Sequence, residues 1–327
     1  MRTKTCVLAL AVSLALAACS GGGGEEPPGG EGGNGGGGGG GDELTPITVA
    51  TLPVSAAVGL EIGVREGIFE EHGLDVTITQ GQGGAALLPS VMAGEYQFAT
   101  SNPLSLMQAE SQGLDVEVVS GYSHSFAEGD DINGTYVGAQ TDIREITDLE
   151  GASIAVNTLG GLGDLTIREM VRQAGGDPDT IDFVELPFPD IPAALANGDV
   201  DGAWLPEPFI SIAGDDARLV EYQNQLVAPG LSTMVLFTSG QYAEESPEVV
   251  EAFTAAATEA LALADENPDL QREVLPEILE MDAALAESIR LEGLSAEIDR
   301  PSIEAVNEMA VRDGIYGEPI DLDEFLP

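Results

Sequence analysis

The chain has 327 residues and a formal net charge of −46 at pH 7, with 57 aspartate and glutamate residues against only 11 lysine and arginine residues. Because so acidic a surface offers no basic patch, binding to nucleic acid or to anionic lipid headgroups is excluded. The acidity is typical of adaptation to salt, which screens the repulsion between like charges, and equally of the compositional bias of a GC-rich genome.

Residues 1–18 have the pattern of a secretory signal peptide. Arg2 and Lys4 precede the apolar run Cys6–Ala18, which is too short for a mature transmembrane helix of about 20 residues. The small residues before Cys19 are similar to the bacterial lipoprotein signal, in which the cysteine after the cleavage site is lipidated; the alternative is a plain signal peptide cut nearby. We therefore predict an extracytoplasmic protein that Cys19 anchors to the outer face of the cell membrane.

Residues 19–43 are predicted to form a disordered linker. In Ser20–Glu43, 15 of the 24 residues are glycine and none has a large apolar side chain, so the segment cannot offset its ordering entropy. A flexible chain of this length spans about 25–30 Å on average. Because Cys6 leaves with the signal peptide and Cys19 carries the lipid, the folded part has no thiol for a disulfide, a zinc site or a nucleophile.

From Leu44 onward, short apolar or alternating runs exchange with helical patterns, which indicates an α/β fold. The expected strands are Ile47–Leu52, Leu74–Thr79, Tyr96–Thr100, Val116–Ser120, Ser153–Asn157, Asp182–Leu186, Asp201–Trp204 and Thr233–Thr238. The expected helices include Ser55–Glu66, Leu165–Gln173 and Ile191–Ala196, followed after Pro247 by Glu248–Ala264, Leu270–Leu279, Ala283–Leu291 and Ser302–Asp313.

Two parts of the chain repeat the same order of strands, helices and turns. Val49–Leu52 matches Val156–Leu159 at an offset of 107 residues, and Ala93–Ala99 matches Asn197–Ala203 at an offset of 104. Turn chemistry is shared among α/β units, but ordered matches at nearly one offset favour two similar lobes. Because ligands bind beyond the carboxyl ends of the strands in open α/β sheets, two facing lobes predict a cleft between them.

The residue inventory argues against catalysis. Lys4 is the only lysine, so the mature chain cannot form a Schiff base with a pyridoxal cofactor. His72 and His124 are the only histidines, they lie far apart, and no nucleophile-elbow motif accompanies them. We therefore expect a protein that is not an enzyme and that uses no cofactor and no metal.

The segment Trp204–Phe209 holds the only tryptophan, followed by Glu207 between two prolines. Trp204 and Phe188 are interpreted either as core aromatics or as a stacking wall for a ligand. The flanking prolines restrict the backbone, and a rigid corner loses little entropy when a ligand binds. We therefore favour a position in the cleft, where Glu207 accepts hydrogen bonds from an amine or a ring N–H.

The glycine-rich loop Gly160–Gly163 follows a predicted strand. It lacks the Lys-Ser/Thr of a P-loop, and Thr166 stands where a dinucleotide-binding motif has its third glycine. Two interpretations stay open: the loop holds a small anion with its backbone N–H groups, or it is an ordinary βα turn.

The predicted ligand contacts follow strands of both lobes. They are Pro53, Ser55, Gln80, Ser101, Asn102, Tyr122, Asn157, Thr158, Gly160, Phe188, Trp204 and Glu207.

Five segments carry a family resemblance: Ala57–Phe69, Glu71–Val76, Val91–Ala99, Ile146–Gly151 and Ala193–Phe209. In this order they resemble solute-binding proteins of nitrate, sulfonate and taurine type ABC importers, which include binders of thiamine-pyrimidine precursors. The resemblance implies a two-lobe, type II periplasmic-binding fold, with lobe 1 in residues 44–137 and 234–327 and lobe 2 in residues 138–233. It also implies hinge crossovers near Val137–Ile143 and Ala228–Met234, and extra C-terminal helices packed on the first lobe.

The same resemblance implies that the cleft closes around one solute and that the loaded protein, a monomer, delivers it to the transmembrane subunit of an ABC permease. The predicted cargo is a small organic solute, either sulfonate-like or taurine-like, or a pyrimidine or other heterocyclic amine. The predicted cleft loops contain no lysine or arginine, which departs from a simple sulfonate or nitrate trap, although backbone amides and polar side chains can still hold an anion. An organic solute is favoured over bare nitrate. An enzyme or a surface sensor on the same two-lobe fold is the alternative.

Overall fold

The computed structural model describes residues 44–81 and 83–327, so the predicted signal peptide, the predicted lipidation of Cys19 and the predicted linker lie outside the described residues. The strands are β1 Thr45–Thr51, β2 Leu74–Gln80, β3 Phe98–Ser101, β4 Val116–His124, β5 Asn133–Gly138, β6 Ser153–Val156, β7 Asp182–Glu185, β8 Gly202–Pro206, β9 Ala217–Glu221, β10 Ser232–Ser239 and β11 Gly293–Leu294.

The α-helices are α1 Val58–Arg65, α2 Ile68–Glu71, α3 Gly84–Met92, α4 Pro103–Ser111, α5 Leu162–Gln173, α6 Ile191–Asn197, α7 Phe209–Ala213, α8 Gln223–Val227, α9 Gly240–Glu245, α10 Pro247–Glu266, α11 Pro268–Ile278, α12 Ala283–Ser288, α13 Arg300–Arg312 and α14 Leu322–Phe325. Short 3-10 helices occur at Ser55–Ala57, Ile146–Leu149, Pro178–Thr180, Phe188–Asp190 and Gly214–Asp216.

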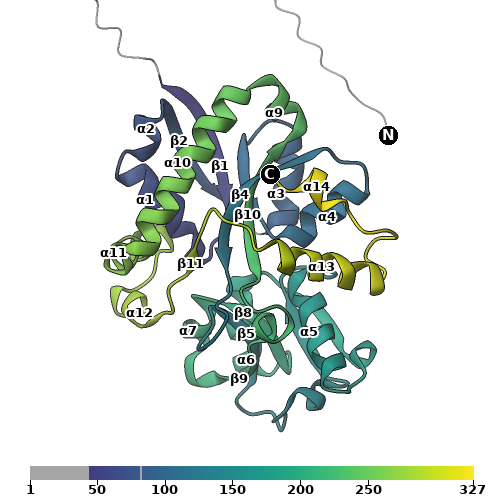
Figure 1. The fold of residues 1–327 in the computed structure, drawn as a ribbon. Helices are drawn as coiled ribbons and strands as arrows, with labels where there is room; N and C mark the ends of the chain where they lie inside the picture. Colours follow the sequence, from purple (N-terminus) through teal and green to yellow (C-terminus); the bar gives the residue numbers. More distant parts are fainter. Residues whose placement is uncertain (1–43, 82) are drawn as a thin grey trace, which may run out of the picture. The chain divides into compact units, whose positions relative to one another are not determined.

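Within these residues the strands form two sheets, with the orders β11-β4-β10-β3-β1-β2 and β7-β6-β8-β5-β9. In each sheet three strands run parallel, β2-β1-β3 and β7-β6-β8, and the next strand, β10 or β5, is antiparallel. The first sheet occupies the upper part of Figure 1 and the second the lower part. The predicted α/β fold with two similar lobes is therefore confirmed.

The sequence repeat corresponds to one turn used in both sheets. Helices α3 and α6 are followed by Gly94 and Gly198, each in the left-handed region with φ of 73°. In both turns the glycine N–H donates a hydrogen bond to the carbonyl oxygen three residues earlier, at 2.9 Å for Gly94 and 3.1 Å for Gly198. The N–H of the acidic residue after each glycine donates to the carbonyl oxygen five residues before that acidic residue. Glycine adopts this helix-ending conformation without a Cβ clash, which explains the Gly-acid pair in both copies.

Helix α10 packs on the first sheet and against α1. The Phe253 ring stacks on Phe98 with ring centroids 3.8 Å apart and on Phe69 with ring centroids 5.7 Å apart. A Cβ atom at Gly63 of α1 would lie 2.6 Å from the Ala260 Cβ of α10, so this glycine permits the close approach of the two helices. The long C-terminal helix therefore returns to the first lobe, as expected.

The chain crosses between the two sheets at residues 125–132, from β4 to β5, and at residues 228–231, from α8 to β10. The first crossing lies earlier than expected. Strand β5 pairs with β8 and β9, so residues 133–137 belong to the second sheet and the crossover predicted near Val137–Ile143 is wrong. Strand β5 was not predicted from the sequence, because Asn133 and the two glycines of this strand are residues that strands usually lack.

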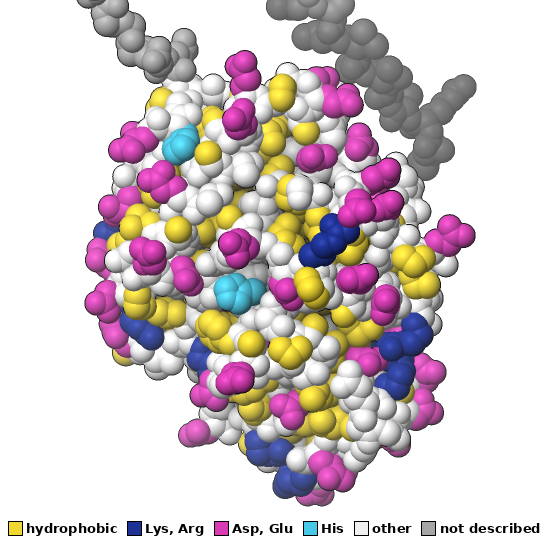
Figure 2. Space-filling model, viewed as in Figure 1, with side chains coloured by type: hydrophobic (Ala, Val, Ile, Leu, Met, Phe, Trp, Pro, Cys, Tyr) yellow, Lys and Arg dark blue, Asp and Glu magenta, His cyan; other side chains and the backbone are white. Residues whose placement is uncertain are grey.

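Figure 2 shows acidic side chains distributed over the visible face, with most of the fewer basic side chains on its lower half. Across residues 44–81 and 83–327, no helix is both long and apolar enough to cross a bilayer.

Candidate functional site

A cavity of about 60 Å³ lies between the two sheets. It forms where β1, β3, β6 and β8 end, which is the edge at which open α/β sheets bind ligands. Its walls come from both sheets, from the first crossing and from a C-terminal segment. They are Leu52, Val54, Ala56, Asn102, Ser123, Ile132, Asn133, Asn157, Phe188, Trp204, Pro206, Thr233, Met234 and Glu292.

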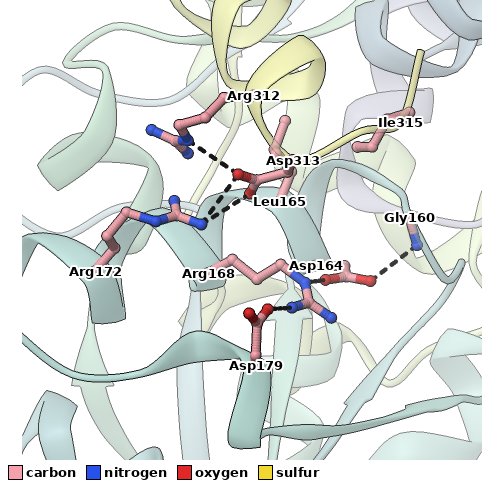
Figure 3. Close-up of a pocket in the computed structure, with 9 residues that line it drawn as sticks. All are labelled: Gly160, Asp164, Leu165, Arg168, Arg172, Asp179, Arg312, Asp313 and Ile315. Atoms are coloured by element: carbon pink, nitrogen blue, oxygen red, sulfur yellow. Dashed lines mark hydrogen bonds and ion pairs between the residues drawn. The ribbon is translucent and has the colours of Figure 1, made fainter. Parts of the chain in front are cut away.

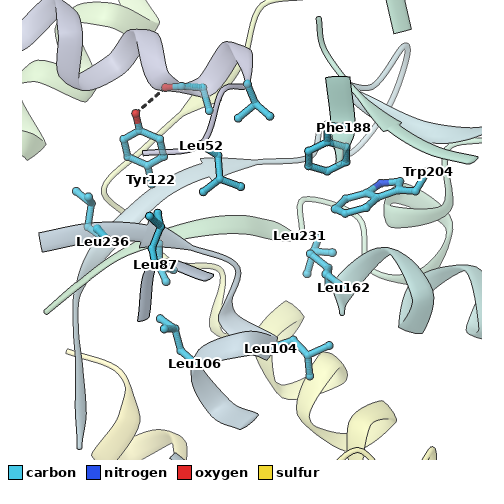
Figure 4. Close-up of a cluster of buried hydrophobic side chains, with 14 of the residues drawn as sticks. Leu52, Leu87, Leu104, Leu106, Tyr122, Leu162, Phe188, Trp204, Leu231 and Leu236 are labelled. Carbon is cyan, nitrogen blue, oxygen red and sulfur yellow. Dashed lines mark hydrogen bonds between the residues drawn. The ribbon is translucent and has the colours of Figure 1, made fainter. Parts of the chain in front are cut away.

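Two aromatic rings form one wall of the cavity. The rings of Phe188 and Trp204 lie 5.5 Å apart at 64°, and Phe188 also stacks on Phe209. The Trp204 indole N–H donates to the Asn133 side-chain oxygen at 3.4 Å. Figure 4 shows both rings beside Leu52 of the first lobe. The indole is 9% exposed, so it packs in the core and faces the cavity at the same time.

The glycine-rich loop supports the indole. A Cβ atom at Gly163, in the first turn of α5, would lie 2.3 Å from an indole carbon of Trp204. The N–H of Gly160 donates to an Asp164 carboxylate oxygen at 2.9 Å, and the preceding N–H donates to Glu185 at 3.0 Å. Since carboxylates accept these bonds, the geometry favours an ordinary βα turn over an anion site, and Gly163 is needed for close packing.

Glu207 connects three segments rather than facing the cavity. Its side chain is buried, and its carboxylate accepts hydrogen bonds from the backbone N–H of Ser211 at 3.2 Å and of Arg290 at 3.3 Å. Its carbonyl oxygen accepts the Ser55 N–H at 3.2 Å. Burial raises the pKa of the Glu207 side chain, and the hydrogen bonds from Arg290 and Ser211 partly offset the increase. Its geometry therefore gives it a positioning role instead of the expected contact with an amine.

The acidic residue that lines the cavity, Glu292, was not among the predicted ligand contacts. Glu292 lies between α12 and β11, is 5% exposed and accepts a hydrogen bond from the Ser55 hydroxyl at 2.5 Å. Burial, together with repulsion from Asp131 and Glu207, raises its pKa to about 8 despite that hydrogen bond. No local motif marks Glu292, because its partner Ser55 is 237 residues away along the chain.

Several of the predicted contacts gather at this cavity. Asn102, Asn157, Phe188 and Trp204 line it, and Ser55 bonds to Glu292 at its wall. Around this group, Tyr122 donates its hydroxyl to the carbonyl of Ala56 at 2.6 Å, a bond drawn in Figure 4. Ser101 is fully buried beside Asn102, and Thr158 follows Asn157.

Three predicted contacts lie elsewhere, so they are not part of the cavity. Pro53 and Gln80 line a separate groove of about 550 Å³ against the end of α11, where the Gln80 amide donates to the Ile278 carbonyl at 3.0 Å. Gly160 lines a pocket of about 590 Å³ between α5 and α13. Pro53 and Gly160 follow strands and Gln80 is the last residue of β2. Both hollows are lined by residues of the two lobes, but neither includes the aromatic wall of Phe188 and Trp204.

The pocket between α5 and α13 contains an ion-pair network, shown in Figure 3. Arg172 of α5 lies 3.0 Å from the carboxylate of Asp313, and Arg312 of α13 lies 2.7 Å from Glu169. Arg168 pairs instead with two aspartates of its own lobe. Because each of these arginines has a carboxylate partner, the network joins the two lobes and does not present an open anion site.

Comparisons with known proteins agree with this architecture. Residues 57–270 match the family model described as NMT1/THI5 like. The chain is 27% identical over 202 residues to the taurine-binding periplasmic protein of Escherichia coli (strain K12), and this match covers 62% of the chain and 61% of that relative, less than two thirds of its length.

The chain is also 25% identical over 240 residues to the formylaminopyrimidine-binding protein of Halalkalibacterium halodurans, which covers 71% of the chain and 70% of the relative. Among solved structures, it is similar to the alkanesulfonate-binding protein SsuA of Xanthomonas axonopodis pv. citri bound to MOPS. That match has a TM-score of 0.72 and 16% identity and covers 87% of this chain and 99% of SsuA. At this identity the likeness shows the fold alone.

Proposed function

Because the chain belongs to the NMT1/THI5-like family and has the two-lobe fold of periplasmic binding proteins, we propose that it is the solute-binding protein of an ABC importer. It captures a small organic solute outside the cytoplasm and delivers it to the transmembrane subunit of the permease. The names of two relatives, a taurine-binding and a formylaminopyrimidine-binding protein, support this assignment.

The observation that carries the proposal is the cavity between the sheets. Residues of both lobes line it at the carboxyl ends of their strands, so a solute held there contacts both lobes at once. Such a solute favours the conformation in which the lobes are together, because only that conformation makes both sets of contacts. The crossings at residues 125–132 and 228–231 act as the hinge, which revises the lobe boundary before β5.

Binding without chemistry fits the site better than catalysis. The polar side chains that line the cavity include Asn102, Asn157 and Glu292, and no lysine, histidine or cysteine is among the lining residues. Covalent catalysis commonly uses a cysteine or lysine nucleophile, or a serine activated by a histidine, and the lining offers no cysteine, no lysine and no histidine to activate a serine. We therefore propose that the solute leaves the protein chemically unchanged.

The sequence-based lipid anchor completes the proposal. Cys19 holds the chain at the outer face of the cell membrane, and the glycine-rich segment up to residue 43 lets the binding domain reach the permease.

The test is a solute screen on the mature chain carrying Cys19→Ser. Trp204 is the only tryptophan and lines the cavity, so its fluorescence reports occupancy directly. Taurine, alkanesulfonates, aminopyrimidines and nitrate are titrated, and thermal unfolding is followed in parallel. We expect one class to change the fluorescence and to stabilise the fold, by about 2.7 kcal/mol at 100 times its dissociation constant.

Mass spectrometry of the solute released on unfolding provides the control. Recovery of the unchanged solute supports a binding protein, whereas recovery of a product favours the enzyme alternative. Unchanged fluorescence and thermal stability across all four classes would contradict the proposed function.

A further inference from the structure

Glu292 combines deep burial with one oxygen that lacks a partner. Its side chain is 5% exposed and lines the cavity. One carboxylate oxygen, Oε1, accepts the hydrogen bond from the Ser55 hydroxyl, whereas Oε2 is buried and has no hydrogen-bond partner among the residues that the structure describes. An unpaired buried carboxylate oxygen is costly, so this atom points to a donor that the solute supplies.

The charged groups around Glu292 do not neutralise it. Glu207, at the corner after β8, and Asp131, in the crossing before β5, both add repulsion to the effect of burial. Arg290, two residues before Glu292, is directed at other carboxylates, with guanidinium nitrogens 3.7 Å from Glu207 and 3.7 Å from Asp130. The cavity itself has neither lysine nor arginine among its lining residues.

The other titratable groups beside this segment lie on α10 and β4. Asp265 of α10 accepts a hydrogen bond from the Leu294 N–H at 3.1 Å. The Tyr122 hydroxyl is committed to the carbonyl of Ala56, and burial raises the pKa of Tyr122, so this side chain stays neutral. The His124 ring lies against Gly293, the residue after Glu292, and no hydrogen bond between His124 and Glu292 occurs in the described residues. Ser55 is thus the group that bonds to the Glu292 carboxylate.

On the premise that this cavity is the solute site proposed above, we infer that Glu292 binds a cationic N–H group of the solute, such as an ammonium, an amidinium or a protonated ring nitrogen. The N–H donates to the free Oε2, and the positive charge compensates the carboxylate. The apolar part of the solute lies against Trp204 and Phe188. An anionic group in the same place meets acidic side chains and no basic one.

This pairing couples solute binding to a proton. In the free chain the pKa of Glu292 is raised to about 8, so at pH 7 the carboxyl group is mostly protonated. A cation next to the carboxylate favours the ionised form, and binding therefore releases a proton. For a solute that keeps its own charge, affinity rises by up to about tenfold per pH unit and levels off above a pH of about 8.

The experiment uses the mature chain carrying Cys19→Ser and small probes of matched size. Acetamidinium and methylguanidinium are the cations, and acetate and methanesulfonate are the anions. Trp204 fluorescence gives the affinities between about pH 6.5 and about pH 8.5, and calorimetry in two buffers of different ionisation enthalpy counts the protons released. We expect the cations to bind, with release of close to one proton near the lower pH.

The decisive variant is Glu292→Gln. It should weaken binding of the cations by roughly tenfold or more and remove both the proton release and the rise of affinity with pH. Glu287→Gln is the matched control, because Glu287 is exposed on the adjacent α12. This variant should have the same cation affinity, proton release and pH dependence as the unmodified chain. Should Glu292→Gln not fold, the proton release measured with Glu292 in place decides the question.

Tighter binding of acetate or methanesulfonate than of the cations, with the same affinity in Glu292→Gln, would overturn the inference and leave the proposed function standing. Cation binding without proton release or pH dependence would also overturn it. The solute screen separates the two proposals, because a chain in which no solute of either charge affects Trp204 lacks the proposed function itself.

Discussion

Two buried glutamates, similar in burial, have different roles because their partners differ. Glu207 accepts hydrogen bonds from two backbone N–H groups and from the Ser211 hydroxyl, which stabilise its charge. Glu292 accepts a single hydrogen bond, from Ser55, and its other oxygen is free of protein partners in the described part of the chain. The first residue therefore holds segments together, and the second is available to a solute.

The raised pKa of Glu292 makes stability depend on pH. Between the usual glutamate value of 4.5 and about 8, the folded chain keeps a proton that the unfolded chain has lost. The contribution of Glu292 to the free energy of unfolding is therefore fully present below pH 4.5 and is lost as the pH rises to about 8. We expect Glu292→Gln to become progressively more stable than the unmodified chain over this range.

Thermal unfolding of both chains across this pH range measures the difference, in which the titration of other groups cancels. Glu287→Gln serves again as the control and should follow the unmodified chain. Parallel curves for Glu292→Gln and the unmodified chain would show that Glu292 titrates normally.

At the scale of elements, α5 and α13 form an ionic contact between the lobes. Arg172 with Asp313, and Arg312 with Glu169, connect a helix of the second lobe to a helix that packs on the first. Each pair is partly open to solvent and so contributes only about 0.2–1 kcal/mol. If the proposed opening of the lobes separates α5 from α13, these pairs favour the closed conformation over an open one.

Arg172→Gln should therefore weaken solute binding by roughly twofold to fivefold, because the closed conformation loses the free energy of the ion pair between Arg172 and Asp313. Trp204 fluorescence titration with the solute from the screen measures the change, and high salt should reduce the difference. Arg168→Gln is the matched control, since Arg168 lies on the same helix but pairs within its own lobe. Equal losses from both variants would indicate a general effect on α5 instead.

In the whole molecule, two sheet-centred lobes follow an N-terminal segment for which we propose a lipid anchor from the sequence alone. The described residues contain the cavity between the sheets and the two crossings, and the glycine-rich segment before residue 44 connects them to Cys19. If lipidation occurs there, the protein needs no transmembrane helix to stay at the membrane.

Cys19→Ser should move the protein from the membrane fraction to the soluble fraction, because the lipid is the only anchor proposed. Cell fractionation measures this shift. Cys6→Ser, which changes a cysteine within the predicted signal peptide, should leave the protein in the membrane fraction. Membrane attachment of Cys19→Ser would contradict the lipoprotein interpretation.

The α/β class and the repeated lobe could be predicted from the sequence alone, because alternating apolar residues and Gly-acid turns are local signals. The sequence did not reveal β5, whose asparagine and glycines suit a loop until Gly134 is seen packed against Leu219 and Tyr222. Conformational preferences that depend on such neighbours cannot be read from a short window.

Which acidic side chain lines the cavity depends on the tertiary structure. It brought Glu292 to Ser55 across 237 residues and turned the carboxylate of Glu207 toward Ser211 and Arg290. The burial of Glu292, the repulsion from nearby carboxylates and its unpaired oxygen all depend on segments that are distant in the sequence and close in space. Local sequence patterns cannot reveal contacts of this kind.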